Sequence, residues 1–459
     1  MAESTKAVGI DLTEGDVFQQ LLRFALPLLL ASLVEQLYNT VDMVVIGQFV
    51  GSAGSNGVSN GGEVATLITF VATAFSSAAQ IYVAQLYGTK NHRAINETLM
   101  TSMIFMALLS IVSLAISMVF CTQFLHWLNC PQEAFSQAQD YMLTVSLGLP
   151  AVFGYNMVCG VLRGMGEAKW PLLFIVIASV FNVMMDILLV AIIPLGATGT
   201  AIATVVAQYA SFIASAVFLY RKREQFNLQF SKKSFKINRK HMAMLLKLGI
   251  PLTVQTALIH FSLLLCTSYI NAFGLIASTT NSIGNRISKL INIFASAVTQ
   301  GAGAMMGQNI GAKKYDRVKK ILDATLVCSA VCAGIAGLIA GFMPKYVYSI
   351  FMKSSDPNYE AILNLGAIYL RYCILTFALC VIQGSYQSVV RGSGNAKLSL
   401  LAGLLDSIIL RLGFSFLLAY TCGMGVEGFF LGNCLARLGP IAVSVIYYYS
   451  GRWKKFDFL

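Results

Sequence analysis

The chain has 459 residues, of which 57% are hydrophobic and only 11% are charged, whereas soluble proteins carry about 25% charged residues. Its mean hydropathy of +0.71 exceeds what a water-exposed fold can bury, which excludes a soluble globular protein and places the chain in a bilayer. The net charge of +12 does not indicate nucleic-acid binding, because the basic residues fall in the breaks between apolar stretches.

Twelve apolar stretches follow one another along the chain. Each is long enough to cross a hydrocarbon core about 30 Å thick, which takes about 20 helical residues. They lie at approximately 18–49, 58–83, 95–121, 138–163, 168–194, 196–221, 244–272, 281–307, 321–345, 361–388, 396–422 and 426–450. The predicted fold is an all-α integral membrane protein with twelve transmembrane helices.

Lysine and arginine are distributed unevenly among the breaks. Most lie in the even-numbered breaks or in the two tails, whereas Lys345 and Lys353 stand in an odd-numbered one. By the positive-inside rule, both termini are predicted to be cytoplasmic, in a multi-pass protein of the inner (plasma) membrane.

Charged and polar residues inside the first six stretches are the candidates for function, because a charge in the membrane is costly. The first stretch carries a polar stripe formed by Glu35, Tyr38, Asn39 and Asp42, since a spacing of seven returns to nearly the same helix face. In the fifth stretch, Asn182 and Asp186 are four residues apart and share a face. Nearby stretches add Tyr155, Asn156 and Thr204. This oxygen-rich set suits a proton or a hard cation, although buried polar groups can also serve only to hold helices together.

The second half of the chain has no equivalent acidic cluster. It offers Gln255 and His260 in the seventh stretch, and Asp406, which we expect to be neutralised by Arg411 or Arg437. A lone intramembrane histidine can carry a proton, but it is more often a core residue. The ten cysteines show no spacing typical of a metal site or a disulfide framework.

The two halves repeat each other with a period near 225 residues. The run Gln85–Lys90 is echoed by Gln308–Lys313, and the turn at Arg163–Lys169 is echoed by Arg391–Lys397. Pro27 matches Pro251, and the glycines Gly196 and Gly199 match Gly425 and Gly428. We therefore predict two pseudo-symmetric six-helix lobes around a central cavity, as in transporters whose parallel repeats rock about a central site. The predicted divisions are an N-terminal lobe at 1–220, a basic cytoplasmic linker at 221–243 and a C-terminal lobe at 244–459.

These motifs together resemble the multidrug and toxic compound extrusion (MATE) family over essentially the whole chain. The resemblance rests on Pro27, the run from Gln36 to Gly51, the Arg-Gly-x-Gly turn that begins at Arg163, and the pair Asn182 and Asp186. Within the family the sequence is most similar to the DinF-like branch, because Gln255 replaces a glutamate found in NorM-like members. The resemblance implies a cation-coupling site at Asp42, Asp186, Asn182, Thr204 and Tyr38. If the ion is Na⁺, it implies Asp42, Asp186 and Asn182 as ligands.

The implied function is antiport of H⁺ or Na⁺ against cationic, amphipathic drugs by alternating access. We expect a substrate cavity that includes Glu35, Asn39, Tyr155, Asn156, Gln255 and His260. We also expect a hinge at Pro27, which lacks a backbone N–H and lets the helix bend. Membrane lipids are expected partners, and the protein is expected to be a monomer with no cofactor besides the coupling ion. A lipid-linked oligosaccharide flippase of the same superfamily is the alternative, and no enzymatic activity is expected.

Overall fold

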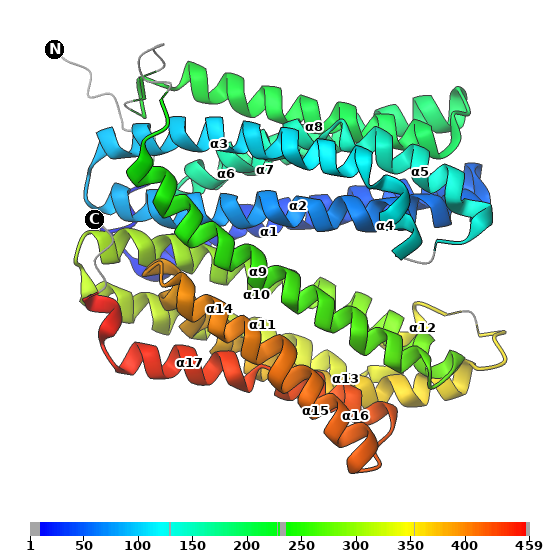
Figure 1. Ribbon diagram of the computed structural model, residues 1–459. Helices are drawn as coiled ribbons and strands as arrows, with labels where there is room; N and C mark the ends of the chain where they lie inside the picture. Colours follow the sequence, from blue (N-terminus) through cyan, green and yellow to red (C-terminus); the bar gives the residue numbers. More distant parts are fainter. Residues whose placement is uncertain (1–9, 128–129, 227, 230–235, 353, 456–459) are drawn as a thin grey trace. The chain divides into compact units, whose positions relative to one another are not determined.

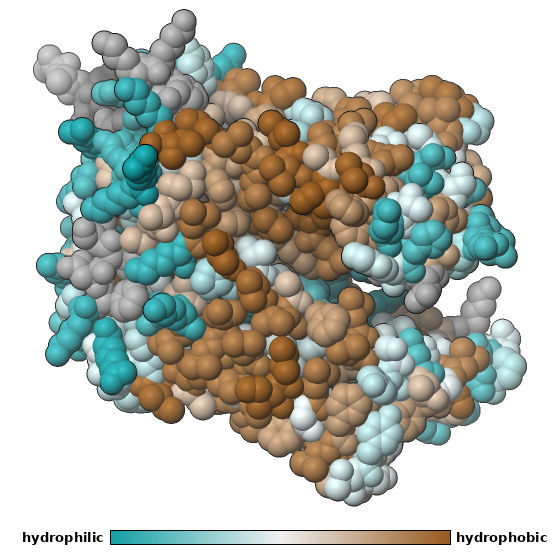
Figure 2. Space-filling model, viewed as in Figure 1, coloured by the Kyte–Doolittle hydropathy of each residue, from teal (hydrophilic) through white to brown (hydrophobic). Residues whose placement is uncertain are grey.

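The computed structural model describes residues 10–127, 130–226, 228–229, 236–352 and 354–455, and none of these residues forms a β-strand (Figure 1). Ten helices in this part of the chain are long and apolar enough to cross a membrane, and the pair α5–α6, bent by 48°, makes an eleventh span. Helix α10, with 37 residues, is also long enough to cross a membrane. These twelve spans correspond to the twelve predicted stretches, and the predicted fold class is confirmed. In Figure 2, hydrophobic side chains cover the middle of the helices and hydrophilic ones gather toward their ends.

The described chain divides into two compact units. Unit 1 contains Leu26–Ile250 together with the stretch that ends at Asp11, and unit 2 contains Leu12–Ala25 together with Pro251–Leu459. The predicted lobes differ from these units, because a short N-terminal segment of each half is grouped with the other half. Residues 227 and 230–235 of the predicted linker lie outside the described residues.

Most helices of the first half belong to unit 1. They are α1 (Val17–Phe49), α2 (Gly51–Gly88), α3 (His92–Val119), α4 (Cys121–Trp127), α5 (Gln132–Ser146), α6 (Leu149–Gly164), α7 (Lys169–Asp186), the π-helical η1 (Ile187–Ile192) and α8 (Gly196–Arg221). Helices α2 and α6 pack at Gly160, where a Cβ atom would come within 2.5 Å of the Ser76 carbonyl oxygen. Only a glycine allows this close approach.

The helices of the second half follow the same order. They are α9 (Arg239–Asn271), α10 (Leu275–Gly311), α11 (Tyr315–Phe342), α12 (Pro344–Ser349), α13 (Tyr359–Gly392), α14 (Ala396–Leu404), the π-helical η2 (Leu405–Leu412), α15 (Gly413–Phe416), the π-helical η3 (Leu417–Thr421), α16 (Val426–Leu435), α17 (Leu438–Tyr449) and the 3₁₀ turn η4 (Arg452–Lys454).

Backbone conformation confirms the internal repeat. Among the described residues, only two that are not glycine have a positive φ, and they are the matched pair Lys90 and Lys313, both at 57°. Gly166 and its counterpart Gly394 also have positive φ values, of 85° and 72°. The repeated sequence motifs therefore form repeated turns, and these turns need residues that tolerate the left-handed region.

Helices α1 and α9 each pass from one unit to the other beside a proline. The crossing in α1 lies between Ala25 and Leu26, next to Pro27, and the crossing in α9 lies between Ile250 and Pro251. A proline inside a helix removes one backbone hydrogen bond and allows the helix to bend. Both crossings are therefore at the points where these helices bend most easily.

The segment before the crossing in α1 is anchored within unit 2. The Leu12 backbone N–H donates to Gln308 Oε1 at 3.0 Å, and Lys314 Nζ donates to the Thr13 carbonyl oxygen at 3.1 Å. The Arg317 guanidinium donates to the Gly15 carbonyl oxygen at 2.7 Å.

The segment before the crossing in α9 is anchored within unit 1 in a comparable way. Asn238 Nδ2 donates to Glu97 Oε2 at 2.7 Å, and His241 Nε2 lies 3.3 Å from the same oxygen. In each half of the chain, hydrogen bonds to polar or charged side chains therefore attach the start of the first helix to one unit. That unit is the one that contains most of the other half.

Candidate cation-binding site

Three helices of unit 1 carry the polar residues of the candidate site. Helix α1 contributes Asp42, which is 8% exposed, and the end of α7 contributes Asn182 and Asp186, which are 1% and 0% exposed. Helix α8, which packs against α7, contributes Thr204 and the fully buried Thr200. The chain returns from α7 through the π-helical turn η1 directly after Asp186, and such turns are frequent at functional sites.

The carboxyl groups of Asp42 and Asp186 lie close enough to share a hydrogen bond when one of them is protonated. Asn182 precedes Asp186 by one helical turn on the same face of α7. Two acidic groups this close repel each other when both are ionised. The pair is therefore suited to hold either one proton or a cation between its oxygens.

Several oxygen atoms of this set have no hydrogen-bond partner among the described residues. They are Asp42 Oδ1, Asn182 Oδ1, Asp186 Oδ1 and Oδ2, Thr200 Oγ1 and Thr204 Oγ1. Buried polar atoms are nearly always hydrogen-bonded in folded proteins, so this group of buried oxygen atoms without partners is unusual within one unit. Carboxylate, amide and hydroxyl oxygens together match the ligand preference of a hard cation such as Na⁺. The described residues contain no group of three or more His, Cys, Asp or Glu that could hold a metal ion.

Tyr141 on α5 belongs to this set and was not predicted. It is 8% exposed, and the charges of Asp42 and Asp186 act on it electrostatically. The sequence offered little sign of its role, because a tyrosine at the start of an apolar span is also typical of a membrane interface. Thr200 was also missed, although its spacing of four from Thr204 puts both residues on one face of α8.

Tyr38 lies at the edge of the set, half-buried on α1, and interacts with Asp42, Tyr141 and Glu35. Glu35 is exposed and also interacts with Tyr155. The remaining polar residue of the predicted stripe, Asn39, is exposed as well. The predicted stripe on α1 is therefore buried at Asp42 and exposed toward Glu35.

The two predicted cavity residues on α6 have partners elsewhere. The Tyr155 hydroxyl donates to the Pro171 carbonyl oxygen at 3.4 Å, and Asn156 Nδ2 donates to the Val152 carbonyl oxygen at 2.9 Å. Neither bond joins these residues to the carboxyl pair.

Gln255 and His260 belong to unit 2. Gln255 is buried against Gly403, where a Cβ atom would lie 2.5 Å from the glutamine Cγ. His260 is half-buried, and the positive charges of Arg411 and Lys289 act on it electrostatically. Arg411 Nη2 in turn donates to Asp406 Oδ1 at 2.9 Å, and both side chains are 5% exposed, which confirms the predicted neutralising pair.

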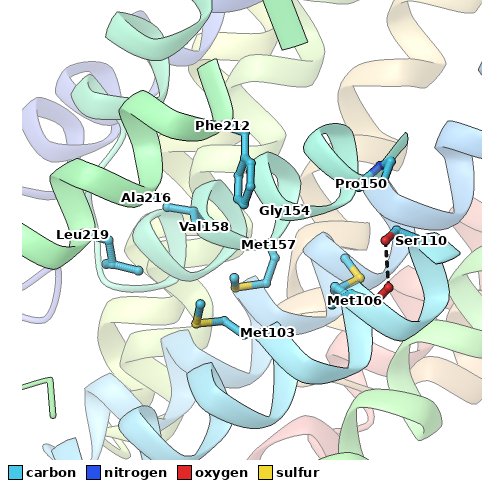
Figure 3. A pocket seen from close by; sticks show the side chains of 11 residues that line it. Met103, Met106, Ser110, Pro150, Gly154, Met157, Val158, Phe212, Ala216 and Leu219 are labelled. Atoms are coloured by element: carbon cyan, nitrogen blue, oxygen red, sulfur yellow. Dashed lines mark hydrogen bonds between the residues drawn. The ribbon is translucent and has the colours of Figure 1, made fainter. Parts of the chain in front are cut away.

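Unit 1 also contains an apolar cavity of about 270 Å³ between α3, α6 and α8 (Figure 3). Its walls include Met103, Met106, Met157 and Phe212. None of the residues of the candidate cation site lines it.

Comparison with known proteins assigns the fold to a family. The MatE family model matches residues 27–188 and 251–417, and these two segments begin at Pro27 and Pro251. The probable multidrug resistance protein YoeA of Bacillus subtilis is 23% identical over 454 residues, covering 96% of each chain. The probable multidrug resistance protein NorM of Thermotoga maritima is 20% identical and covers 96% of this chain and 94% of its own.

Solved structures show the same fold. A MOP superfamily transporter from Pyrococcus furiosus aligns with a TM-score of 0.88 at 18% identity, covering 97% of each chain. A multidrug resistance MATE family transporter of the MOP superfamily in an outward-facing conformation aligns with a TM-score of 0.87, also at 18% identity and covering 97% of each chain. The matched segments span most of this chain, once in each repeat. The chain therefore belongs to the MatE family of multidrug and toxic compound extrusion transporters.

Proposed function

We propose that this protein is a secondary active efflux transporter that exchanges H⁺ or Na⁺ for cationic, amphipathic small molecules. The observation that supports this proposal most strongly is the buried pair Asp42 and Asp186, whose oxygens Asp42 Oδ1, Asp186 Oδ1 and Asp186 Oδ2 have no hydrogen-bond partner among the described residues. The names of YoeA and NorM as multidrug resistance proteins agree with extrusion of drugs.

The carboxyl pair explains why a cation would be taken up. Transfer of a carboxylate into the membrane interior costs roughly 2.5–3.5 kcal/mol on insertion scales, and a second carboxylate beside it adds repulsion. A proton or Na⁺ held between Asp42 and Asp186 removes the repulsion and lowers the net charge of the pair from −2 to −1. Asn182, Thr200, Thr204 and Tyr141 would supply further oxygen atoms around the ion.

Helix α1 connects the site at Asp42 to unit 2, because its first residues belong to that unit. Asp42 lies 15 residues after Pro27, about 22 Å along the helix, and the residues before Pro27 are anchored in unit 2 by Gln308, Lys314 and Arg317. Ion binding at Asp42 would change the bend at Pro27 and so favour one state of the alternating-access cycle. Entry of the ion down its own gradient would drive export, and a potential of 100 mV adds about 2.3 kcal/mol for each positive charge that enters in excess of the charge carried out.

The topology is part of the same proposal. We infer a monomer in the plasma membrane, in contact with lipids, with both termini cytoplasmic. Cys422 is exposed and directly follows η3, at the edge of an odd-numbered break, so a membrane-impermeant maleimide should label it in intact cells, as mapped by peptide mass spectrometry. A cysteine introduced by Lys320→Cys should react only after permeabilisation. Labelling of that residue from outside would overturn the topology.

Efflux from reconstituted vesicles, with the pH gradient and the Na⁺ gradient imposed separately, tests the function. One of the two gradients should drive export of a fluorescent amphipathic cation by the wild-type protein. Asp42→Asn should abolish this export while the protein stays folded. Glu133→Gln makes the same chemical change at an exposed position of α5 and should leave export unchanged. Gradient-driven export by Asp42→Asn at the wild-type rate would refute the assigned site.

A further inference from the structure

The apolar cavity between α3, α6 and α8 is a second candidate binding site in unit 1. Its volume is about 270 Å³, and α6 packs against both α3 and α8 beside it. In Figure 3, Met103 and Met106 of α3 and Met157 of α6 extend into the same space as Leu219 of α8. An engineered apolar cavity of about 150 Å³ in another protein binds benzene. The cavity in unit 1 is therefore large enough to hold a ligand.

The cavity offers almost no polar group to a ligand. No charged side chain is among the described residues that line it, and the Ser110 hydroxyl already donates to the Ala107 carbonyl oxygen at 2.8 Å. A buried water molecule needs about two to four polar partners, so water is not held there. An organic cation would lose its hydration without gaining a counter-charge. The walls therefore select a neutral, apolar group.

The lining residues extend for about two turns along each helix. They run from Met103 to Ser110 on α3 and from Phe212 to Leu219 on α8, about 10 Å along each axis, and from Pro150 to Val158 on α6, about 12 Å. A space elongated in this direction suits a flexible hydrocarbon chain. Methionine side chains adapt their shape to such a ligand, because they are unbranched and flexible.

The cavity reaches the surface of unit 1 at Ala107, which lines it and is exposed. The neighbouring side chains of Leu108 and Ile111 on α3 and of Ile213 on α8 are each more than half exposed. Both helices are long and apolar enough to cross a membrane, and apolar side chains on the outside of such helices contact lipid. The opening is therefore continuous with a surface that lipid chains cover.

Helix α6 forms the inner wall of the cavity. Met157 and Val158 on this wall are each 2% exposed. The Phe212 ring covers Gly154, where a Cβ atom would come within 2.3 Å of the ring. A group that contacts the Met157 methyl must therefore lie inside the cavity, because the surrounding bilayer does not reach this side chain.

We propose that this cavity binds one acyl chain of a membrane lipid, inserted between α3 and α8 and in contact with Met157. Atoms that line an empty cavity lose van der Waals contacts on one side, and a hydrocarbon chain restores these contacts without burying a polar group. The chain would also support α8, which carries Thr200 and Thr204 of the candidate cation site. The acyl-chain site is distinct from the carboxyl pair and does not rest on the proposed antiport.

Nuclear Overhauser effects between methionine methyl groups and lipid chains test the proposal. The full-length protein is perdeuterated, labelled with ¹³C-methyl methionine and placed in phosphatidylcholine nanodiscs, and each signal is assigned by substituting one methionine with leucine. The Met157 methyl should show a cross-peak with acyl-chain methylene protons, which disappears in chain-deuterated lipid. Met184, 63% exposed on α7, is the positive control, whereas Met305, 0% exposed in α10, should show no cross-peak.

Two alanine substitutions separate the cavity from the general lipid surface. Ala216→Phe places a ring in the cavity and should abolish the Met157 cross-peak while that of Met184 remains. Ala115→Phe adds the same ring at an exposed position of α3 that does not line the cavity, and it should leave both cross-peaks unchanged. An unshifted Met305 signal shows that a variant is folded. Ala107→Phe, which closes the opening, gives the same test if Ala216→Phe does not fold.

Absence of the Met157 cross-peak in the wild type would overturn the proposal, and so would a cross-peak of wild-type intensity in folded Ala216→Phe. Rhodamine 6G, an amphipathic cation, tests a different occupant. Its addition should leave the contact between Met157 and lipid in place. Loss of that contact, with new cross-peaks between Met157 and the dye, would show that the cavity holds substrate and would also overturn the acyl-chain site.

Discussion

At the scale of single residues, burial distinguishes the acidic side chains of the candidate site from the acidic side chain of Glu35. Asp42 and Asp186 are the two carboxyl groups that the fold places together in unit 1, and both are buried. Glu35, on the same helix as Asp42, is exposed. The difference between these acids comes from their surroundings and not from their chemistry.

Tyr141 should contribute to ion binding through its hydroxyl group. Tyr141→Phe keeps the buried ring and removes the hydroxyl oxygen, on which the charges of Asp42 and Asp186 act. One lost hydrogen-bonding group is worth about 1 kcal/mol, so the affinity for the coupling ion should fall about fivefold. Isothermal titration with Na⁺, or the midpoint of a proton titration, measures this change. Tyr209→Phe removes an exposed hydroxyl that donates to the Leu147 carbonyl oxygen; the same loss in this control would exclude a specific role for Tyr141.

At the scale of secondary-structure elements, the π-helical segments place polar groups where a regular α-helix would not. Asp406 and Arg411 are five residues apart, which would separate them by about 140° around an α-helix with 3.6 residues per turn. Both lie in η2, and a π-helix bonds each residue to the one five positions away. Their side chains therefore meet in an ion pair.

Breaking this ion pair should destabilise unit 2 strongly. Arg411→Met leaves Asp406 buried without its partner, and removal of one member of a buried pair costs about 3–5 kcal/mol. The double variant Asp406→Asn/Arg411→Met removes the uncompensated charge and should recover most of the lost stability. Unfolding in detergent, followed by circular dichroism, gives both values. A double variant no more stable than Arg411→Met would show that the pair does not act as a unit.

The prolines in α1 and α9 should control the rate of transport. An alanine at position 27 or 251 restores a backbone N–H that can bond four residues back, which stiffens the helix where the chain passes between units. Pro27→Ala and Pro251→Ala should therefore slow the export rate in vesicles. Pro344→Ala alters the first turn of α12, where the N–H has no partner in the helix. Export by the two hinge variants at the rate of Pro344→Ala would argue against hinges at these prolines.

At the scale of the whole molecule, the sequence predicts where the helices lie better than it predicts which segments pack together. Hydropathy located all twelve spans, and the repeated motifs predicted the matched turns at Lys90 and Lys313. Neither signal could show that Leu12–Ala25 packs with unit 2, because periodicity describes one helix at a time. The contacts of Tyr141 were also missed, since they depend on how α5 packs against α1 and α8.

The molecule as a whole should show reciprocal coupling between ion and substrate. If the coupling ion lowers the affinity for substrate by some factor, the substrate lowers the affinity for the ion by the same factor. We propose that protonation or Na⁺ binding at Asp42 and Asp186 favours the state that releases substrate, and on this proposal substrate affinity in detergent should fall as pH falls or as Na⁺ rises.

Three variants locate the source of this coupling. Asp42→Asn removes the carboxylate that responds to the ion, and substrate affinity should then be independent of both pH and Na⁺. Gln255→Ala and His260→Ala change unit 2, outside the carboxyl pair, and should keep the dependence of the wild type even where they change the affinity itself. Equilibrium binding of a fluorescent amphipathic cation between pH 6 and pH 8, with and without Na⁺, measures all four proteins. A dependence that persists in Asp42→Asn and vanishes in His260→Ala would move the coupling site to unit 2, because the carboxylate of Asp42 would then not be the group that responds to the ion.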